Sequence, residues 1–414
     1  MHKFDVVIIG GGASGIAAAI SARRCGKDVV ICEKMPRLGK KILISGAARC
    51  NISNKNLSEG HYNPESRALV KSVFSRFGRE AIEGFFDGLG LKLYSEADRI
   101  FPVTNQASSV LKVLEAELKN LNIPVEFGFE AYDIAHSAEG FIVKLRSGKT
   151  LAGNSIIITG GGKTYPSLGS NGSCYALAGL FGHKIIYPVP SVVPLLVKDR
   201  FCHLLQGQKI QCIARSVIDG KIKKEAKGEL LFAKYGLSGT AILDVSEDIS
   251  IAINRLAPLD TPFAPASALQ CLTGHGKKLA QVSIDLVPFI DGPKLKEEIE
   301  KRIQKGFAKE DLMIGILPNK FSLVFRDLFK DASVKKIVEM LKCRKFDIIG
   351  TRGWNEAEFT AGGIDTVEVR ENSLESKLKK DVYFAGEILN VNGERGGYNL
   401  AWAWASGFVA GLTG

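Results

Sequence analysis

A glycine-rich turn between a strand and a helix constrains the fold more than any other feature of the chain. Residues 4–9 are largely apolar, Gly10-Gly11-Gly12-Ala13-Ser14-Gly15 follows at once, and residues 16–25 are alanine-rich. This is Gly-x-Gly-x-x-Gly, whose glycines permit a tight turn and a close approach of the backbone to a pyrophosphate, while the helix start offers free N–H groups. We therefore predict dinucleotide binding, with contacts from Gly10, Gly12, Ala13, Ser14 and Gly15.

An acidic residue at the end of the second predicted strand supports the same interpretation. Residues 28–32 are mostly apolar, and Glu33 follows them. A carboxylate in this place accepts hydrogen bonds from both hydroxyls of an adenosine ribose and repels a 2′-phosphate. We expect Glu33 and its neighbour Lys34 to line the adenosine end of the ligand. A signal peptide over residues 6–20 is the alternative, but the glycines would interrupt its apolar helix.

Cysteine spacing and charge limit the classes of function. The eight cysteines are scattered without a Cys-x-x-Cys pair, which argues against a zinc site and favours reduced thiols in the cytoplasm. No metal site is visible, and no other stretch has the roughly eighteen apolar residues that a membrane span needs. The net charge is +11, and residues 198–234 carry nine Lys or Arg against four Asp or Glu. A basic surface attracts nucleic acid, although a solubilising surface is the simpler explanation.

The order of predicted elements divides the cofactor unit between the two ends of the chain. The N-terminal part alternates strands with helices, predicted at 65–90 and 107–120, and a β-rich meander follows over 125–159. This order is typical of a doubly wound α/β fold. From about Pro188 the pattern changes to short strands, and after Gly353 the N-terminal texture returns. The middle of the chain is therefore predicted to be an insertion.

The sequence pattern changes once within the insertion, from short strands to helices. Prolines at positions 258, 262 and 265 predict a linker after the short strands. Residues 293–343 are charged and helical, with apolar residues at 295, 299, 303 and 307 at helical spacing. Gly315 to Pro318 divides this region into at least two helices. The insertion is thus predicted to be β-rich first and helical afterwards.

A second motif, residues 39–54, should run along the bound dinucleotide. Lys40, Lys41 and Arg49 offer positive charge to its pyrophosphate, and Asn51 is expected beside it. Cys50 suggests a redox role, but no second cysteine lies five residues away on either side. A dithiol relay is therefore excluded, and a small packed residue is the simpler interpretation of Cys50.

Two further glycine-rich segments are predicted to approach the cofactor. Thr159, Gly160 and Gly161 follow an apolar strand, but Pro166 interrupts any helix directly behind them. We interpret this segment as a strand return, so the chain has no second dinucleotide fold and a nicotinamide cofactor would dock transiently. Near the C-terminus, a strand ends in a Gly-Glu pair and a diglycine begins a helix whose dipole stabilises negative charge on a reduced ring. The residues expected there are Gly386, Glu387, Gly396, Gly397, Tyr398 and Asn399.

With these segments in place, the chain resembles the HI0933-like flavoprotein family, also described as BaiN-like or aminoacetone-oxidase-like FAD proteins. This family is related to the glutathione-reductase-type FAD fold. The matching stretches span the whole chain, and the blocks Ser-Gly-x-x-Arg-Cys-Asn and Gly-Gly-Tyr-Asn-Leu are its most specific ones. The stretches include residues 4–54, 159–173, 228–239 and 376–411.

The resemblance implies one tightly held FAD and an architecture of three parts. A Rossmann-like FAD-binding domain would comprise residues 1–187 and 353–414. A β-barrel-like insertion would comprise 188–262 and 337–352, and a mainly helical subdomain 263–336. The resemblance places Arg49, Cys50 and Asn51 near the flavin, and the strand that contains Ala131 at the adenine.

The chain departs from the family pattern at several positions. Ala47 and Ala48 replace glycines that are common in the family, and Asn390 replaces a usual Asp. Lys234 stands where a family block has His, which removes a group that titrates near neutrality. We therefore do not carry the family's particular substrate or proton donor over to this chain.

The leading hypothesis is an FAD-dependent oxidoreductase reduced by NAD(P)H, which moves hydride to or from an activated C=C or C=N bond of a small molecule. Its catalytic candidates are Arg49, Cys50 and Tyr398, with Lys163 and Tyr165 as further proton donors. One alternative is a base-modifying reductase that docks RNA on Lys221, Lys223, Lys224, Lys227 and Tyr235. Another is a flavin-bound redox sensor without turnover.

Overall fold

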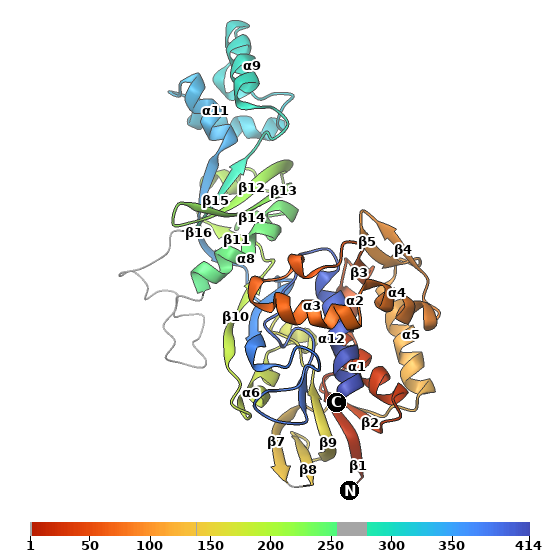
Figure 1. Cartoon of the computed structure of the whole chain (residues 1–414). Coiled ribbons are helices and arrows are strands. Elements are labelled where there is room, and N and C mark those ends of the chain that lie inside the picture. Colours follow the sequence, from red (N-terminus) through yellow and green to blue (C-terminus); the bar gives the residue numbers. More distant parts are fainter. Residues whose placement is uncertain (1, 138, 255–279) are drawn as a thin grey trace. The chain divides into compact units, whose positions relative to one another are not determined.

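A computed structural model describes residues 2–137, 139–254 and 280–414 of the chain. These residues divide into two units. One unit contains Met1–Pro188 together with Phe359–Gly414, and the other contains Val189–Glu358 (Figure 1). The first unit therefore takes residues from both ends of the chain. The predicted three-part division stays a prediction, and its boundary at 262/263 and the proline linker lie outside the described residues.

A mixed sheet forms the centre of the first unit. Its strands β1, β2, β6, β9 and β18 run parallel, while β8 pairs antiparallel with both β9 and β7. Val6 to Ile9 are buried, as expected for a parallel strand covered on both faces. The order is β6 (Val125–Phe127), β2 (Val29–Glu33), β1 (Lys3–Ile9), β9 (Thr150–Ile158), β8 (Gly140–Leu145) and β7 (Ala131–Ser137), with β18 (Val382–Phe384) also on β9.

Two helices from opposite ends of the chain pack closely in this unit. A Cβ on Gly407 of α12 (Tyr398–Thr413) would lie 2.2 Å from the Ser14 carbonyl oxygen of α1 (Ala13–Arg24). A Cβ on Gly411 would lie 2.3 Å from the Ala18 carbonyl oxygen. Residues four apart share one face of a helix, so these glycines let the two backbones touch. The Ser21 hydroxyl adds a hydrogen bond of 2.8 Å to the Phe408 carbonyl.

The remaining elements of the first unit surround the sheet (Figure 1). Residues 65–90, predicted as one helical stretch, form two main helices because Gly78 has extended backbone angles and interrupts the helix. The helices are α2 (Lys40–Ile44), α3 (Arg67–Arg76), α4 (Arg79–Gly88), α5 (Ala107–Asn120) and α6 (Ser173–Gly179). A small sheet contains β3 (Ser53–Asn54), β5 (Arg99–Pro102) and β4 (Leu93–Glu96), and β10 (Ile185–Ser191) pairs with β17 (Phe359–Ile364).

A closed antiparallel barrel forms part of the second unit, which confirms the expected barrel-like insertion. Along β12, the alternate residues Ile210, Cys212 and Ala214 are buried, as inward-facing residues of a barrel should be. The strand order is β11 (Leu195–Val197), β14 (Gly236–Ser238), β13 (Lys221–Ala233), β12 (Lys209–Ile218), β15 (Ala280–Asp285) and β16 (Arg344–Thr351). Helices α7 (Arg200–Leu204) and α8 (Thr240–Asn254) accompany the barrel.

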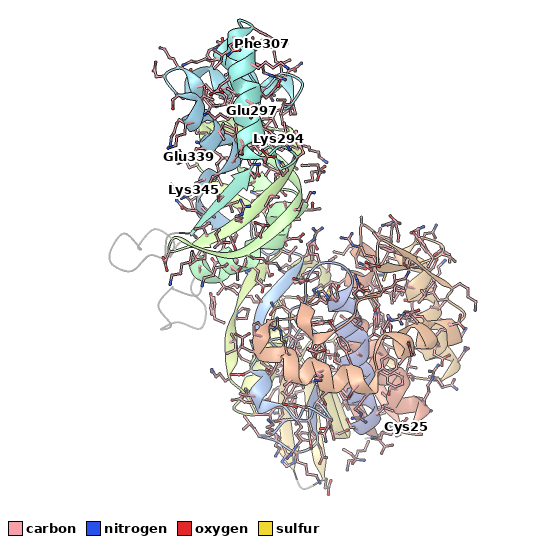
Figure 2. The ribbon with its side chains drawn as sticks, turned by 45° about the horizontal axis from the view of Figure 1, so that its top comes forward. Cys25, Lys294, Glu297, Phe307, Glu339 and Lys345 are labelled. Carbon is pink, nitrogen blue, oxygen red and sulfur yellow. The ribbon has the colours of Figure 1, made fainter. Side chains whose placement is uncertain are left out.

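The helical part of the second unit contains α9 (Gly292–Gln304), α10 (Ser322–Phe329) and α11 (Val334–Lys342). Leu295 and Ile299 of α9 are buried, but Ile303 and Phe307, expected on the same apolar stripe, are each 41% exposed. Figure 2 shows Phe307 beyond the end of α9, where the Arg302 guanidinium lies 5.7 Å from its ring. The stripe is buried only where α9 meets the core that it shares with the barrel.

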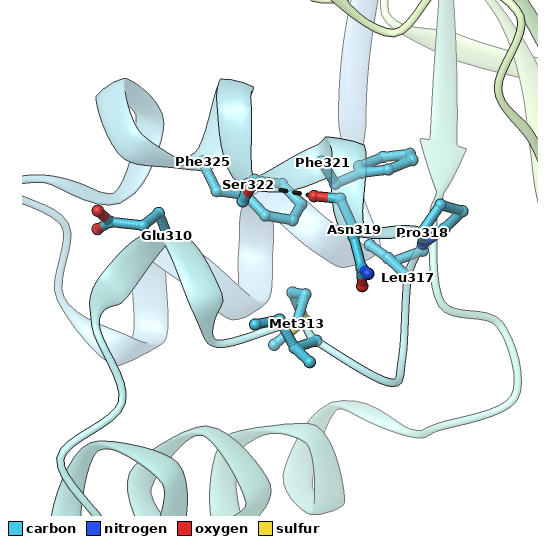
Figure 3. A pocket seen from close by; sticks show the side chains of 9 residues that line it. Glu310, Met313, Leu317, Pro318, Asn319, Phe321, Ser322 and Phe325 are labelled. Carbon is cyan, nitrogen blue, oxygen red and sulfur yellow. Dashed lines mark hydrogen bonds between the residues drawn. The ribbon is translucent and has the colours of Figure 1, made fainter.

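A small cavity lies between α10 and the segment that connects α9 to α10 (Figure 3). Met313, Leu317 and Phe325 contribute apolar walls, and Glu310 and Asn319 contribute polar ones. The cavity of about 10 Å³ has room for about one water molecule. It is therefore too small for an organic substrate.

The close helix contact predicts opposite outcomes for two glycine substitutions. Gly407→Ala should lower the free energy of unfolding by about 2 kcal/mol, because its methyl group would overlap the Ser14 backbone. Gly84→Ala in α4 should raise it by about 0.5–1 kcal/mol, because a Cβ there meets open space. Chemical denaturation of both variants tests this, and equal changes would contradict the packing.

Candidate cofactor site

The glycine turn after β1 borders open space at the start of α1. A Cβ on Gly15 would lie 1.8 Å from the Gly10 carbonyl oxygen, so Gly15 is required for the turn itself. A Cβ on Gly12 would meet nothing within 4 Å. Because Gly12 precedes the first turn of α1 and no described side chain caps this helix, the N–H groups of that turn are available to an anion. Ala13 and Ser14 occupy that first turn.

The segment after β9 lies directly beside this turn. The Thr159 hydroxyl donates to the carbonyls of Ile9 at 3.0 Å and Gly10 at 2.8 Å. A Cβ on Gly160 would lie 2.1 Å from the Cys174 sulfur, and Gly161 has a φ of 72°. The predicted strand return therefore does approach the glycine turn, and its glycines are fixed by packing.

Glu33 at the end of β2 is oriented by backbone groups. Its Oε2 accepts from the Gly11 N–H and its Oε1 accepts from the Met35 N–H, each at 2.7 Å. Because each carboxylate oxygen has two acceptor positions, Glu33 retains capacity for ribose hydroxyls. Lys34 instead points to the loop before α6, where its ammonium lies 2.6 Å from Asn171 Oδ1.

The strand expected at the adenine lies next to Glu33. The Phe129 N–H donates to the Glu33 carbonyl at 3.3 Å, and the Cys32 thiol donates to the Phe129 carbonyl at 3.2 Å. Ala131 begins β7 and is 7% exposed. Phe129, two residues before the predicted adenine strand, therefore lies beside the predicted ribose ligand.

The basic residues of the second motif have protein partners. Lys40 donates to the Ser167 carbonyl at 3.4 Å, whereas Lys41 forms an ion pair of 2.6 Å with Glu387. The Arg49 guanidinium lies 4.1 Å from the Phe101 ring and 3.1 Å from a Glu96 oxygen. All three basic side chains that we predicted to bind a pyrophosphate thus interact with other groups of the protein.

Cys50 and Asn51 occupy a tightly packed part of the same motif. Cys50 is fully buried, and burial raises the pKa of its thiol to about 12. The thiol therefore stays protonated at neutral pH, which does not favour a nucleophilic role. The Asn51 Oδ1 atom is buried without a hydrogen-bond partner among the described residues.

The C-terminal motif completes the same region. A Cβ on Gly386 would lie 2.5 Å from Ser14 Oγ, so this turn touches the start of α1. A Cβ on Gly397, which directly precedes α12, would lie 2.7 Å from Asn51 Oδ1. Gly396 is fixed by a hydrogen bond of 2.9 Å from the Asn54 amide to its carbonyl. The Gly386 turn therefore contacts the start of α1, and the second motif contacts the start of α12.

Tyr398 and Asn399 begin α12 in different surroundings. The Tyr398 ring stacks on His61 at 4.3 Å, and its backbone carbonyl accepts from the Tyr62 hydroxyl at 2.6 Å. Burial, followed by the charge of Glu394, raises the pKa of the Tyr398 hydroxyl. The Asn399 amide is engaged by the backbone of the preceding loop, at Gly393.

Sequence reasoning missed His61, Tyr62, Thr164 and Thr360. The first two hold Tyr398, and the two threonines bind Glu387. No local pattern marks these residues, because their partners lie far away in the sequence. Trp402 and Trp404 of α12 are fully buried in the core of the first unit.

The residues fit an elongated dinucleotide. The first unit provides the Glu33 carboxylate predicted to bind a ribose and open space at the start of α1, and no described side chain caps the start of either α1 or α12. Asn51 Oδ1 and Ser53 Oγ beside Gly397 are buried polar atoms without a partner among the described residues. Among those residues no group of three acidic, His or Cys side chains could hold a metal ion, and no helix is long and apolar enough to cross a membrane.

The chain matches the family model described as the HI0933-like protein Rossmann domain over residues 4–413. It belongs to the HI0933-like family of flavin-dependent oxidoreductases. It is 32% identical to the 3-dehydro-bile acid delta(4,6)-reductase of Clostridium scindens, with 98% of this chain and 97% of that protein covered. The ribosomal RNA dihydrouridine synthase of Haemophilus influenzae is 27% identical over 98% of this chain and 97% of its own length. That of Escherichia coli is 26% identical, with 99% and 97% covered.

Glu33→Ala tests the ribose assignment. Loss of the carboxylate should weaken FAD binding about 10- to 100-fold, because the two charge-assisted hydrogen bonds predicted between Glu33 and the ribose would be lost. Fluorescence titration of the apoprotein with FAD measures this change. Glu117→Ala, which removes an ion pair with Arg24, is the control and should leave FAD affinity unchanged. Unchanged affinity in Glu33→Ala would refute the assignment.

Proposed function

We propose that the protein is an FAD-dependent reductase of C=C bonds that are conjugated to a carbonyl group. The observation that carries the proposal is the juxtaposition of the open turn at Gly12, the Glu33 carboxylate and the Gly386 turn within one unit. Their order suits the pyrophosphate, the adenosine ribose and the flavin side of one FAD. By the family pattern, the start of α12 would adjoin the isoalloxazine.

The substrate class follows from what the relatives' names have in common. A 3-dehydro-delta(4,6) bile acid and a uracil base both contain a C=C bond conjugated to a carbonyl. Bound FAD, reduced by NAD(P)H that docks transiently, would supply a hydride to the carbon remote from the carbonyl. The π electrons then move toward the carbonyl oxygen, and a proton must be added at the adjacent carbon to complete the reduction.

Tyr398 is the proton donor that the site supports best. Its phenol carries a proton to donate at neutral pH, as any tyrosine with a pKa of about 10 does, and burial followed by the charge of Glu394 raises this pKa further. The ring is held by the stacked His61, which limits the orientations of the hydroxyl. Arg49 and Cys50 remain candidates from the family pattern. However, Arg49 is engaged by Glu96 and Phe101, and Cys50 is fully buried.

A two-step kinetic experiment on Tyr398→Phe tests this function. Anaerobic NADH or NADPH should bleach the flavin equally in the variant and the wild type. Reoxidation by a 4,6-dien-3-one steroid or by uridine-containing RNA should be about 100-fold slower in the variant, because the proton donor is lost. Stopped-flow absorbance follows both steps. Equal reoxidation rates would remove Tyr398 from the mechanism, and failure of every conjugated substrate would refute the proposed class.

RNA is the second candidate substrate, favoured by the charge of the barrel. Lys221, Lys223 and Lys227 on β13 are exposed, and none of them forms an ion pair in the described part of the chain. Neighbouring charges, by contrast, are paired: Arg215 with Glu225 at 2.6 Å. The three free ammonium groups can therefore bind phosphates. Tyr235, expected to stack on a base, already lies under the Arg352 guanidinium at 4.8 Å.

The RNA candidate makes a salt-dependent prediction. Replacing Lys221, Lys223 and Lys227 by Ala should reduce the slope of log affinity against log salt by about one for each lysine that contacts phosphate. Filter binding of ribosomal RNA between low and moderate salt measures the slope. Substituting Lys305, Lys330 and Lys335 in the helical part removes equal charge and serves as the control. Equal slopes in both triple variants would contradict this docking surface.

A further inference from the structure

Lys41 and Glu387, both predicted to contact the cofactor, are bound to each other. Lys41 Nζ lies 2.6 Å from Glu387 Oε2, and their side chains are 31% and 21% exposed. Lys41 Nζ also donates to the Thr164 hydroxyl at 2.9 Å. This is a partly buried ion pair between residues that are 346 positions apart in the sequence.

The Glu387 carboxylate is fixed in its position from three sides. Its Oε1 accepts from the Thr360 N–H at 2.8 Å and from the Thr164 hydroxyl at 3.3 Å. A Cβ on Gly162 would lie 3.2 Å from the Glu387 carboxyl carbon, so this glycine lets the loop pass over the carboxylate. Glu387 therefore has little freedom to turn away from its surroundings.

This fixed carboxylate follows the turn that touches the start of α1. Gly386 adjoins Ser14, and its N–H donates to Ser406 Oγ at 2.9 Å. The proposed pyrophosphate lies at the same helix start. An anion held beside a bound anion weakens binding unless a cation compensates it.

We propose that Lys41 is a positioning residue that neutralises Glu387 instead of binding the pyrophosphate, so that FAD affinity depends on the charge balance of the pair. This inference rests on the proposed FAD site. It differs from the sequence-based interpretation, in which the Lys41 ammonium contacts the phosphates directly. The two interpretations predict different results when both charges are removed together.

A double-mutant cycle separates them. Lys41→Met should raise the dissociation constant of FAD about 30-fold, the size expected when a partly buried carboxylate loses its cation. Glu387→Gln retains an oxygen for the Thr360 N–H and should change the constant less than about threefold. The double variant should return to within about threefold of the wild type, because it restores neutrality. Fluorescence titration of each apoprotein with FAD gives the four constants.

Two other outcomes would overturn the proposal. If Lys41 binds the phosphates, Lys41→Met and the double variant should both bind weakly, while Glu387→Gln should bind FAD at least as well as the wild type. If the ion pair only stabilises the fold, all three variants should bind FAD more weakly, and their apoproteins should also unfold at a lower temperature.

One control variant and one readout keep the result interpretable. Lys92→Met breaks an exposed ion pair with Asp87 in the same unit and should leave FAD affinity unchanged. The unfolding temperature of each apoprotein shows whether a variant is folded before FAD is added. Absence of FAD binding by the wild type would refute the proposed function itself, whereas loss without rescue in the double variant would refute only the role of Lys41.

Discussion

Close backbone contact between α1 and α12 is the constraint on which the first unit depends. Gly407 and Gly411 allow the last helix of the chain to touch the first. Because of this contact, the Gly386 turn lies at Ser14 and the start of α12 lies at Asn51. The glycines at the crossing of α1 and α12 thus allow segments from both ends of the sequence to meet at the proposed site.

The second consequence of this assembly is electrostatic. Segments from opposite ends bring charged side chains together in a partly buried region, where a lone charge is costly and a pair is tolerated. Lys41 and Glu387 form such a pair, whereas Lys221, Lys223 and Lys227 on β13 are exposed and form no ion pair with any described residue. The pair lies near the proposed cofactor, and the three lysines lie on the surface proposed to dock RNA.

Local patterns predicted the parts of the site that depend on neighbouring residues. The Gly-x-Gly-x-x-Gly turn and Glu33 were recognisable because strand, turn and helix follow one another directly. The α/β fold and the barrel-like insertion were also predicted, the barrel through the family resemblance. The helices of residues 293–343 were predicted as well, although α9 ends at Gln304, before Phe307, the last residue of the apolar pattern.

Long-range contacts could not be predicted in this way. The partner of Lys41 depends on how residues 346 positions apart meet, and the stacking of His61 on Tyr398 depends on the same closure of the unit. Charge and residue type suggested ligands for a phosphate, but packing decided which of those charges were already paired. The sequence indicated which residue types could bind a phosphate. Only the fold shows which of those side chains already have a partner in the protein.

The most direct test of the central claim is the identity and amount of cofactor released from the purified protein. Heat or acid should release FAD in about equimolar amount with the chain, because the proposed adenosine and flavin ends of the site both lie in the first unit. Chromatography distinguishes FAD from FMN. Release of FMN alone, or a protein that neither contains nor takes up flavin, would contradict the account.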